Sequence, residues 1–200
     1  MRAIRWTAGL AGLSLVMMGT AACDRPRGEQ VRVIDLMERL STAETRPVDG
    51  PFEIREVTCG ASPRPSLAVP PSSRAIWSTL LPSRAVLTAG LAVEGLPGSA
   101  VLFRVGISDD RVYEGLASIT VRADDCGNGW TPVSVDLGDY SGVKFSLFYQ
   151  PNRRSWRIVL ATNIEEGAVV RAYWAQPGIS SDASAAHDYV NRIRQKDPRR

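Results

Sequence analysis

Residues 130–150 read W-T-P-V-S-V-D-L-G-D-Y-S-G-V-K-F-S-L-F-Y-Q. Apolar and polar residues alternate over 133–137 and again over 143–149, which is the period of a strand with one buried face. Between these runs, residues 138–142 have the glycine, aspartate and serine content of a turn. Two alternating runs joined by such a turn predict an antiparallel hairpin.

The rest of the chain contains similar short apolar runs separated by turn residues. They fall at 52–57, 75–80, 86–93, 101–107, 112–121, 156–160 and 170–174. Residues 60–73 are rich in proline and are expected to form a loop with a short edge strand at 67–69, because proline cannot donate to a central ladder. Evenly spaced strands with almost no helix between them predict a mainly β fold, an antiparallel sandwich or barrel.

One core is expected to collect the alternating apolar residues of these strands. The residues that we assign in or against it are Trp130, Val135, Leu137, Phe145, Leu147, Trp156, Ile158 and Trp174.

Two motifs carry a resemblance to a known family. V-D-L-x-x-Y-x-G spans residues 135–142, and W-x-x-P-x-I spans residues 174–179. Together with P-S-R-A-V-L at 82–87, they resemble the galactose-binding-like (jelly-roll) β-sandwich modules of bacterial envelope proteins. The resemblance covers roughly residues 52–179. It is greatest to the non-catalytic sandwich that precedes the catalytic domain in some membrane-associated sulfatase-like proteins. Only residues 180–200 follow here, so the activity of that catalytic domain is not expected.

The first 22 residues have the order of a signal peptide. Arg2 and Arg5 precede a short apolar run, and small residues then lead to Cys23. The run is shorter than the roughly 20 residues that a membrane-spanning helix needs. Cys23 after small residues resembles a bacterial lipobox, although Thr20 replaces the usual Leu, Val or Ile. We expect Cys23 to carry a lipid that anchors the protein in the cell envelope, facing the periplasm. The alternative is an ordinary secretory signal with a coincidental cysteine.

The residue after Cys23 and the charge of the mature chain limit the possible locations and partners. Asp24 resembles an inner-membrane retention signal in the best-known sorting system. Loss of residues 1–22 lowers the basic count from 24 to 22, against 21 acidic residues. This near-neutral balance argues against a nucleic-acid partner.

The mature sequence divides into three expected parts. Residues 23–50 form a lipid-anchored linker with a short amphipathic helix, since Val33, Leu36, Met37 and Leu40 have helical spacing. We expect this helix to pack on the sandwich, and the alternative is that it lies on the membrane surface. Residues 51–180 form the β-sandwich domain. Residues 181–200 form a tail, either a short helix that Ser184 could cap or a disordered segment.

Two cysteines remain after Cys23. Cys59 and Cys126 both lie beside glycine in polar segments, and an oxidising compartment favours their pairing in a disulfide. The alternative is two separate thiols, because a bridge requires the two Cα atoms to lie within about 7 Å.

No catalytic arrangement is evident, and we expect no enzymatic activity and no cofactor. His187 is the single histidine and lies in the C-terminal tail. The acidic pairs 109–110, 124–125 and 165–166 are interpreted as turns, because neighbouring residues point apart and glycosidase carboxylates must face each other across a cleft. No metal site is predicted, although the first two pairs leave a loop calcium site as an alternative.

Candidate ligand-binding residues are few. Tyr140 lies in the turn of the predicted hairpin, and Arg153 and Arg154 lie in the next turn. The sequence as a whole predicts a non-catalytic envelope module that binds a carbohydrate or a protein partner. The alternatives are a structural or assembly lipoprotein without a small ligand, or a small hydrolase.

Overall fold

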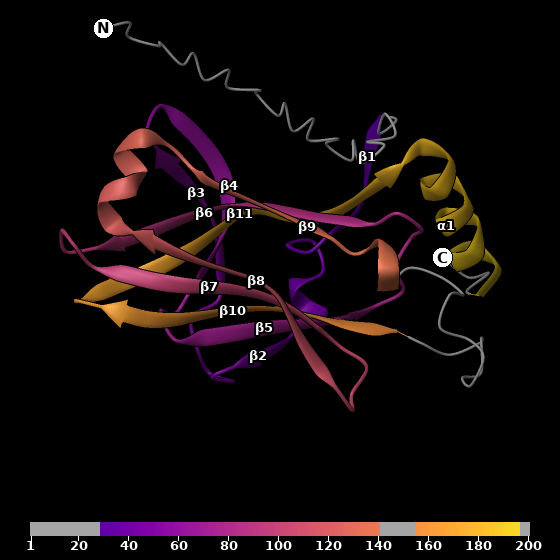
Figure 1. The fold of residues 1–200 in the computed structure, drawn as a ribbon, viewed down its shortest axis with the longest axis horizontal. Coiled ribbons are helices and arrows are strands. Elements are labelled where there is room, and N and C mark those ends of the chain that lie inside the picture. The colour runs from indigo at the N-terminus through magenta and orange to yellow at the C-terminus, as the bar shows by residue number, and fades with distance from the viewer. Residues whose placement is uncertain (1–28, 141–154, 197–200) are drawn as a thin grey trace, which may run out of the picture.

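The computed structural model describes residues 29–140 and 155–196, which fold into two antiparallel sheets packed face to face (Figure 1). The six-stranded sheet consists of β1 (Gln30–Asp35), β3 (Glu53–Cys59), β4 (Ser62–Val69), β6 (Val86–Gly95), β9 (Thr131–Asp136) and β11 (Val169–Asp182). The five-stranded sheet consists of β2 (Glu44–Arg46), β5 (Ser73–Thr79), β7 (Ala100–Ser108), β8 (Tyr113–Arg122) and β10 (Trp156–Glu166). The predicted mainly β, antiparallel sandwich is confirmed.

The strand orders place β1, the first described strand, beside β11, the last one. The first sheet runs β3-β4-β11-β6-β9, with β1 paired to β11, and the second runs β2-β5-β10-β7-β8. Short 3-10 turns connect some strands: η1 (Leu40–Thr42), η2 (Ala123–Asn128) and η3 (Gly138–Tyr140).

One hydrophobic core fills the space between the sheets. In β7, Phe103 and Val105 are buried, whereas Arg104 between them is exposed, as strand alternation requires. Phe103 meets Trp174 of the other sheet edge-on, with 5.1 Å between the ring centroids. This aromatic pair ties the two sheets together at the centre of the core.

Most of the predicted core residues are where the alternation places them. Val135, Leu137, Ile158 and Trp174 are buried, and Trp156 is partly buried against the same core. Phe145 and Leu147, together with the second strand of the predicted hairpin, lie outside the described residues.

The predicted N-terminal helix is wrong. Residues 30–35 form β1, a turn follows, and η1 is a single 3-10 turn. Pairing with β11 satisfies the β1 backbone, and the Asp35 carboxylate accepts a hydrogen bond from the Met37 N–H at 2.9 Å to hold the turn. An isolated helix of three turns is marginal in water, so sheet pairing prevails. Ile34 in β1 and Leu36 and Met37 in the turn are still buried, and Val33 and Leu40 are partly buried against the same core.

The sandwich therefore begins before residue 51. Strand β1 belongs to the six-stranded sheet, and β2 pairs with β5 in the five-stranded sheet. Residues 30–46, which the sequence assigned to a linker, contribute a strand to each sheet.

The proline-rich segment also differs from its prediction as a loop. Strand β4 runs from Ser62 to Val69, and its residues 62–68 pair with β3. On its other side, β11 pairs only with residues 66–69. Pro63 and Pro65 are two residues apart, so the N–H groups that they lack would lie on the same edge of β4. Strand β11 does not pair with β4 at these two positions. Prolines are tolerated at such an edge.

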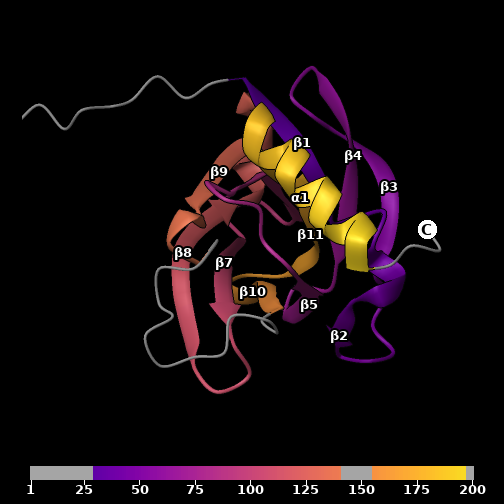
Figure 2. The same cartoon turned by 90° about the vertical axis from the view of Figure 1, so that its right-hand side faces the viewer.

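The chain closes with a helix, which resolves the two alternatives for the tail. Helix α1 (Ala183–Lys196) lies beside β1 and β11 (Figure 2). Its first turn is capped by Asp182, whose carboxylate accepts the Ala185 N–H at 3.0 Å, and not by Ser184. Ala186 and Tyr189 are buried on its inner face.

The signal segment and Cys23 lie outside the described residues. Within residues 29–140 and 155–196, no helix has both the length and the apolar character needed to cross a membrane.

Candidate functional site

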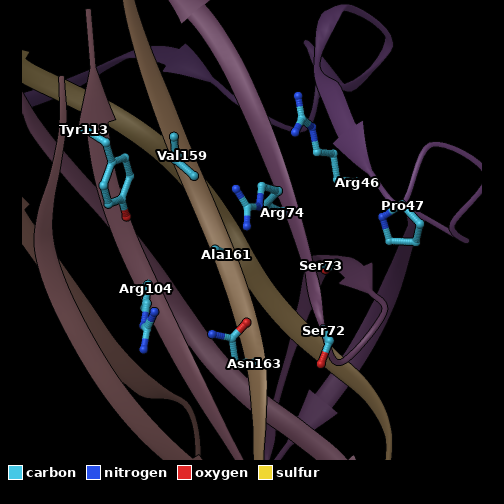
Figure 3. A pocket seen from close by; sticks show the side chains of 10 residues that line it. All are labelled: Arg46, Pro47, Ser72, Ser73, Arg74, Arg104, Tyr113, Val159, Ala161 and Asn163. Atoms are coloured by element: carbon cyan, nitrogen blue, oxygen red, sulfur yellow. The ribbon is translucent and has the colours of Figure 1, made fainter. Parts of the chain in front are cut away.

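A groove of about 510 Å³ opens on the outer face of the five-stranded sheet (Figure 3). Strands β2, β5, β7, β8 and β10 contribute most of its walls and floor. It is lined by Arg46, Pro47, Ser72, Ser73, Arg74, Arg104, Tyr113, Val159, Ala161 and Asn163.

The floor of the groove is made of small and apolar side chains from the central strand, β10. Ala161 pairs with Arg74 of β5 on one side and with Arg104 of β7 on the other. Val159, two residues earlier, lies on the same face and pairs with Gly106 of β7. Because the central positions carry short side chains, the longer flanking ones stand above them and enclose a hollow.

Two of the flanking arginines have no partner among the described residues. Within the described part of the chain, Arg74 and Arg104 form no ion pair, and their side chains make no hydrogen bond. Arg46 differs, because its guanidinium donates to the Glu44 carboxylate at 2.7 Å. Arg46 also pairs directly opposite Arg74 across β2 and β5. Figure 3 shows Arg74 and Arg104 on either side of Ala161.

The end of the groove next to Glu44 is held by a network of exposed ion pairs. Arg157 of β10 donates to the carboxylates of both Glu44 and Asp110. The hydrogen bond from Arg46 lowers the pKa of Glu44, with Arg157 adding to the effect. Both carboxylates are thus engaged with arginines other than Arg74 and Arg104.

An aromatic ring forms one wall of the groove. Tyr113 begins β8 and is 54% exposed. Its ring lies against Gly106 of β7, so close that a Cβ on Gly106 would fall 2.3 Å from the Tyr113 hydroxyl oxygen. The backbone of β7 therefore supports the ring while much of its surface stays open to solvent.

Asn163 adds an amide at the other end of the floor. It follows Ala161 on the same face of β10 and is exposed. Within residues 29–140 and 155–196 its side chain makes no hydrogen bond. An amide offers two donors and an acceptor, which suits a ligand rich in hydroxyl groups.

Tyr140, a predicted ligand-binding residue, does not line this groove. Its ring meets Trp156 edge-on at 5.4 Å between centroids. Loss of solvent around the phenol, followed by a hydrogen bond with Glu114, raises the pKa of Tyr140 to about 12. The residue packs against the core, while Arg153 and Arg154 lie outside the described residues.

Cys59 and Cys126 are joined in a disulfide, with Cα atoms 4.9 Å apart. The bond ties β3 to η2 on the outer face of the six-stranded sheet, opposite the groove. It braces the fold at a distance from the candidate site.

Trp130 lies on that same outer face, which corrects its assignment to the central core. It packs against a second small cluster that includes Cys59 and Tyr173, and its indole donates to the Ser62 carbonyl at 2.8 Å. The reason is its phase in the strand. Buried residues of the β9 segment fall at odd numbers, such as Val133, so an even-numbered residue points outward.

The third acidic pair, Glu165 and Glu166, ends strand β10 and does not form the predicted turn. Glu165 accepts a hydrogen bond from the Thr120 hydroxyl at 2.8 Å, and Glu166 pairs with Arg122 at 3.1 Å.

The other two pairs contain aspartates that brace turns. The Asp109 carboxylate accepts the Val112 N–H at 2.9 Å, the Asp124 carboxylate accepts the Gly98 N–H at 2.9 Å, and the Asp125 carboxylate accepts the Arg122 N–H at 2.8 Å. In the part of the chain that the structure describes, no three His, Cys, Asp or Glu side chains gather as a metal site would require.

Sequence reasoning missed the groove. Its signal was an arginine in the outward phase of an otherwise apolar strand, as in Phe103-Arg104-Val105 and Ser73-Arg74-Ala75. Each such arginine alone is typical of a solvated strand face. Only the register of β5, β10 and β7 brings them together.

No protein-family model matches this sequence. No curated protein matches it either.

Several solved structures are distantly similar. One contains the CBM51-2 and INT domains of Clostridium perfringens ZmpB, at 16% identity and a TM-score of 0.43, covering 78% of this chain and 28% of that one. Another is the CBM22-1 xylan-binding domain of Paenibacillus barcinonensis Xyn10C, at 13% identity and a TM-score of 0.41, covering 70% and 86%. A third is CsCBM6-3 of Clostridium stercorarium in complex with cellobiose, at 11% identity and a TM-score of 0.38, covering 78% and 95%. The chain thus spans little more than a quarter of the length of the first.

Proposed function

We propose that this protein is a non-catalytic module that binds a glycan in the groove on the five-stranded sheet. The observation that carries the proposal is the exposed ring of Tyr113, seated on Gly106, beside hydrogen-bonding groups that have no partner among the described residues. An aromatic face suits the apolar face of a sugar ring, and the Asn163 amide and arginine guanidinium groups suit its oxygens.

The lining of the groove favours binding over catalysis. General acid-base catalysis uses carboxylate, imidazole or similar groups positioned at the reacting bond. The ten lining residues include three arginines, an asparagine and two serines, and none of the ten is acidic or a histidine. The Ser73 hydroxyl is already engaged, since it donates to the Pro70 carbonyl at 2.7 Å.

We further propose that the module is anchored in the cell envelope by a lipid on Cys23, with residues 1–22 removed. The order of charged, apolar and small residues before Cys23 supports this location. Asp24 favours retention at the inner membrane. Labelling with a fatty-acid analogue should mark the wild-type protein and leave Cys23→Ser unmarked, and equal labelling of both would contradict the anchor.

Glycan binding is tested on a polysaccharide array with the purified exported protein. The wild type should bind at least one polysaccharide, and Tyr113→Ala should lose roughly tenfold or more in affinity, because stacking on an aromatic ring is lost. Val112→Ala is the matched control, since Val112 is an exposed neighbour that does not line the groove. Absence of binding across the array would refute the proposed function, as would equal binding by wild type and Tyr113→Ala.

A further inference from the structure

We infer that the glycan bound in this groove is negatively charged, with carboxylate or sulfate groups held by Arg74 and Arg104. This inference rests on the proposed function and specifies its substrate class. It begins from register: Arg74 and Arg104 both pair with Ala161, so they lie at the same level on either side of the small floor residue.

The spacing of the strands allows both arginines to reach one ligand. Neighbouring strands lie about 4.8 Å apart, so residues in register two strands apart have Cα atoms about 10 Å apart. Arg74 and Arg104 are separated in this way by β10. Their long side chains flank a hollow above Ala161 in which an anionic group can contact either guanidinium or both.

The positive charges that line the groove are poorly compensated by the described residues. Like charges directly opposite each other on paired strands are destabilising, and Arg46 stands opposite Arg74. Glu44 offsets Arg46 and Arg157 instead. A bound anion would supply the countercharge that Arg74 and Arg104 lack among the described residues.

The type of cation favours carboxylate or sulfate over a neutral sugar. The planar guanidinium forms two parallel hydrogen bonds to such groups, and charge-assisted bonds are about twice as strong as neutral ones. Tyr113 and Asn163 add surfaces for a sugar ring and its hydroxyl groups, which a simple inorganic anion would leave unused.

The test compares acidic polysaccharides with their own neutral forms. Polygalacturonate, alginate and hyaluronan are each assayed beside the carboxyl-reduced polymer, and heparan sulfate beside its desulfated, carboxyl-reduced form. At least one acidic polymer should bind, and its neutral form should bind roughly tenfold or more weakly, because charge-assisted hydrogen bonds are lost. Raising the salt concentration from 0.05 to 0.5 M shortens the Debye length on the order of threefold. It should weaken the binding of the acidic polymer and leave the binding of its neutral form unchanged.

Variants assign the effect to the two arginines. Arg74→Gln and Arg104→Gln should each lower affinity roughly tenfold. Arg104→Lys should bind more tightly than Arg104→Gln but less tightly than the wild type, because lysine keeps the positive charge and loses the paired N–H donors of the guanidinium. Arg194 is an exposed residue of α1, away from the groove. Arg194→Gln makes the same change of net charge and should bind as the wild type does. Unchanged melting temperatures show that the exposed-site variants are folded.

The outcomes separate this inference from the proposed function. Equal binding of acidic and neutral forms, with loss in Tyr113→Ala, would overturn the charge preference and leave glycan binding intact. Loss in Arg194→Gln as large as in Arg74→Gln would indicate general attraction by net charge and would also overturn the inference. Binding to neither form of any polymer would count against the proposed function itself.

Discussion

Tyr113 lies directly over Gly106, and the two residues belong to neighbouring strands of the sheet that carries the groove. A Cβ on Gly106 would lie 2.3 Å from the hydroxyl oxygen and 2.4 Å from a ring carbon of Tyr113. Gly106 thus does more than permit an extended backbone. The missing side chain at position 106 makes room for the ring that forms one wall of the candidate site.

Gly106→Ala should therefore reduce glycan binding without unfolding the protein. The new methyl group displaces the end of an exposed side chain, which can move into solvent, so we expect a stability change within about 1 kcal/mol. Affinity should fall roughly tenfold, as in Tyr113→Ala. Gly115→Ala is the matched control, because its nearest Tyr113 atom is 4.0 Å from the added Cβ. A Gly106→Ala protein that binds normally would show that the ring position is not needed.

Trp174→Ala should strongly destabilise the fold. Trp174 is 1% exposed and packs edge-on against Phe103 between the two sheets. Removing a buried aromatic ring costs about 3–5 kcal/mol, out of a typical total of about 5–15 kcal/mol. Chemical denaturation should show this loss, and Val170→Ala, on the same strand but 64% exposed, should be nearly neutral. A Trp174→Ala protein of wild-type stability would contradict the assignment of this face of β11 to the core.

The Cys59–Cys126 bridge should contribute substantially to stability. The two residues are separated by 67 positions, and closing a loop of that length in the unfolded chain is worth about 4 kcal/mol on chain-entropy grounds. The double variant Cys59→Ser/Cys126→Ser should lose up to this amount. A digest without reductant should contain the linked peptides, whereas alkylation of both thiols in native exported protein would show that the bridge is absent.

Tyr173 should make stability sensitive to alkaline pH. Burial, followed by the hydrogen bond that its hydroxyl donates to Glu94, raises the pKa of Tyr173 to about 12. An unfolded tyrosine ionises near pH 10, so the folded state holds this proton more tightly. The resulting stability is present below about pH 10 and is lost as pH rises toward 12.

The difference in melting temperature between the wild type and Tyr173→Phe measures this effect. It should be constant below pH 10 and shrink between about 10 and 12. A difference that stays flat across this range would show that Tyr173 ionises equally easily in the folded and unfolded states.

The sequence by itself determined the class of fold. Strict alternation placed Phe103 and Val105 inside and Arg104 outside, since a strand has a fixed period of two. Trp130 was misplaced because it is an even-numbered residue, whereas the core-facing residues of the adjacent strand, such as Val133, are odd-numbered. Trp130 lies on the outer face of the six-stranded sheet. Local chemistry also identified the turns, because the Asp109 carboxylate hydrogen-bonds the backbone only two and three residues ahead.

Only the tertiary structure decided the conformation of the first described segment and the make-up of the candidate site. The apolar residues near the start of the chain fit a helix as well as a strand, and pairing with β11, far away in sequence, selected β1. Arg74 and Arg104 are 30 positions apart and meet at Ala161 through pairings that neither local sequence specifies. Periodicity is a property of the residues in one strand, whereas register is a property of strand pairs. The sequence therefore predicted which side chains face outward, and the folding of the sheet determined which of them lie together.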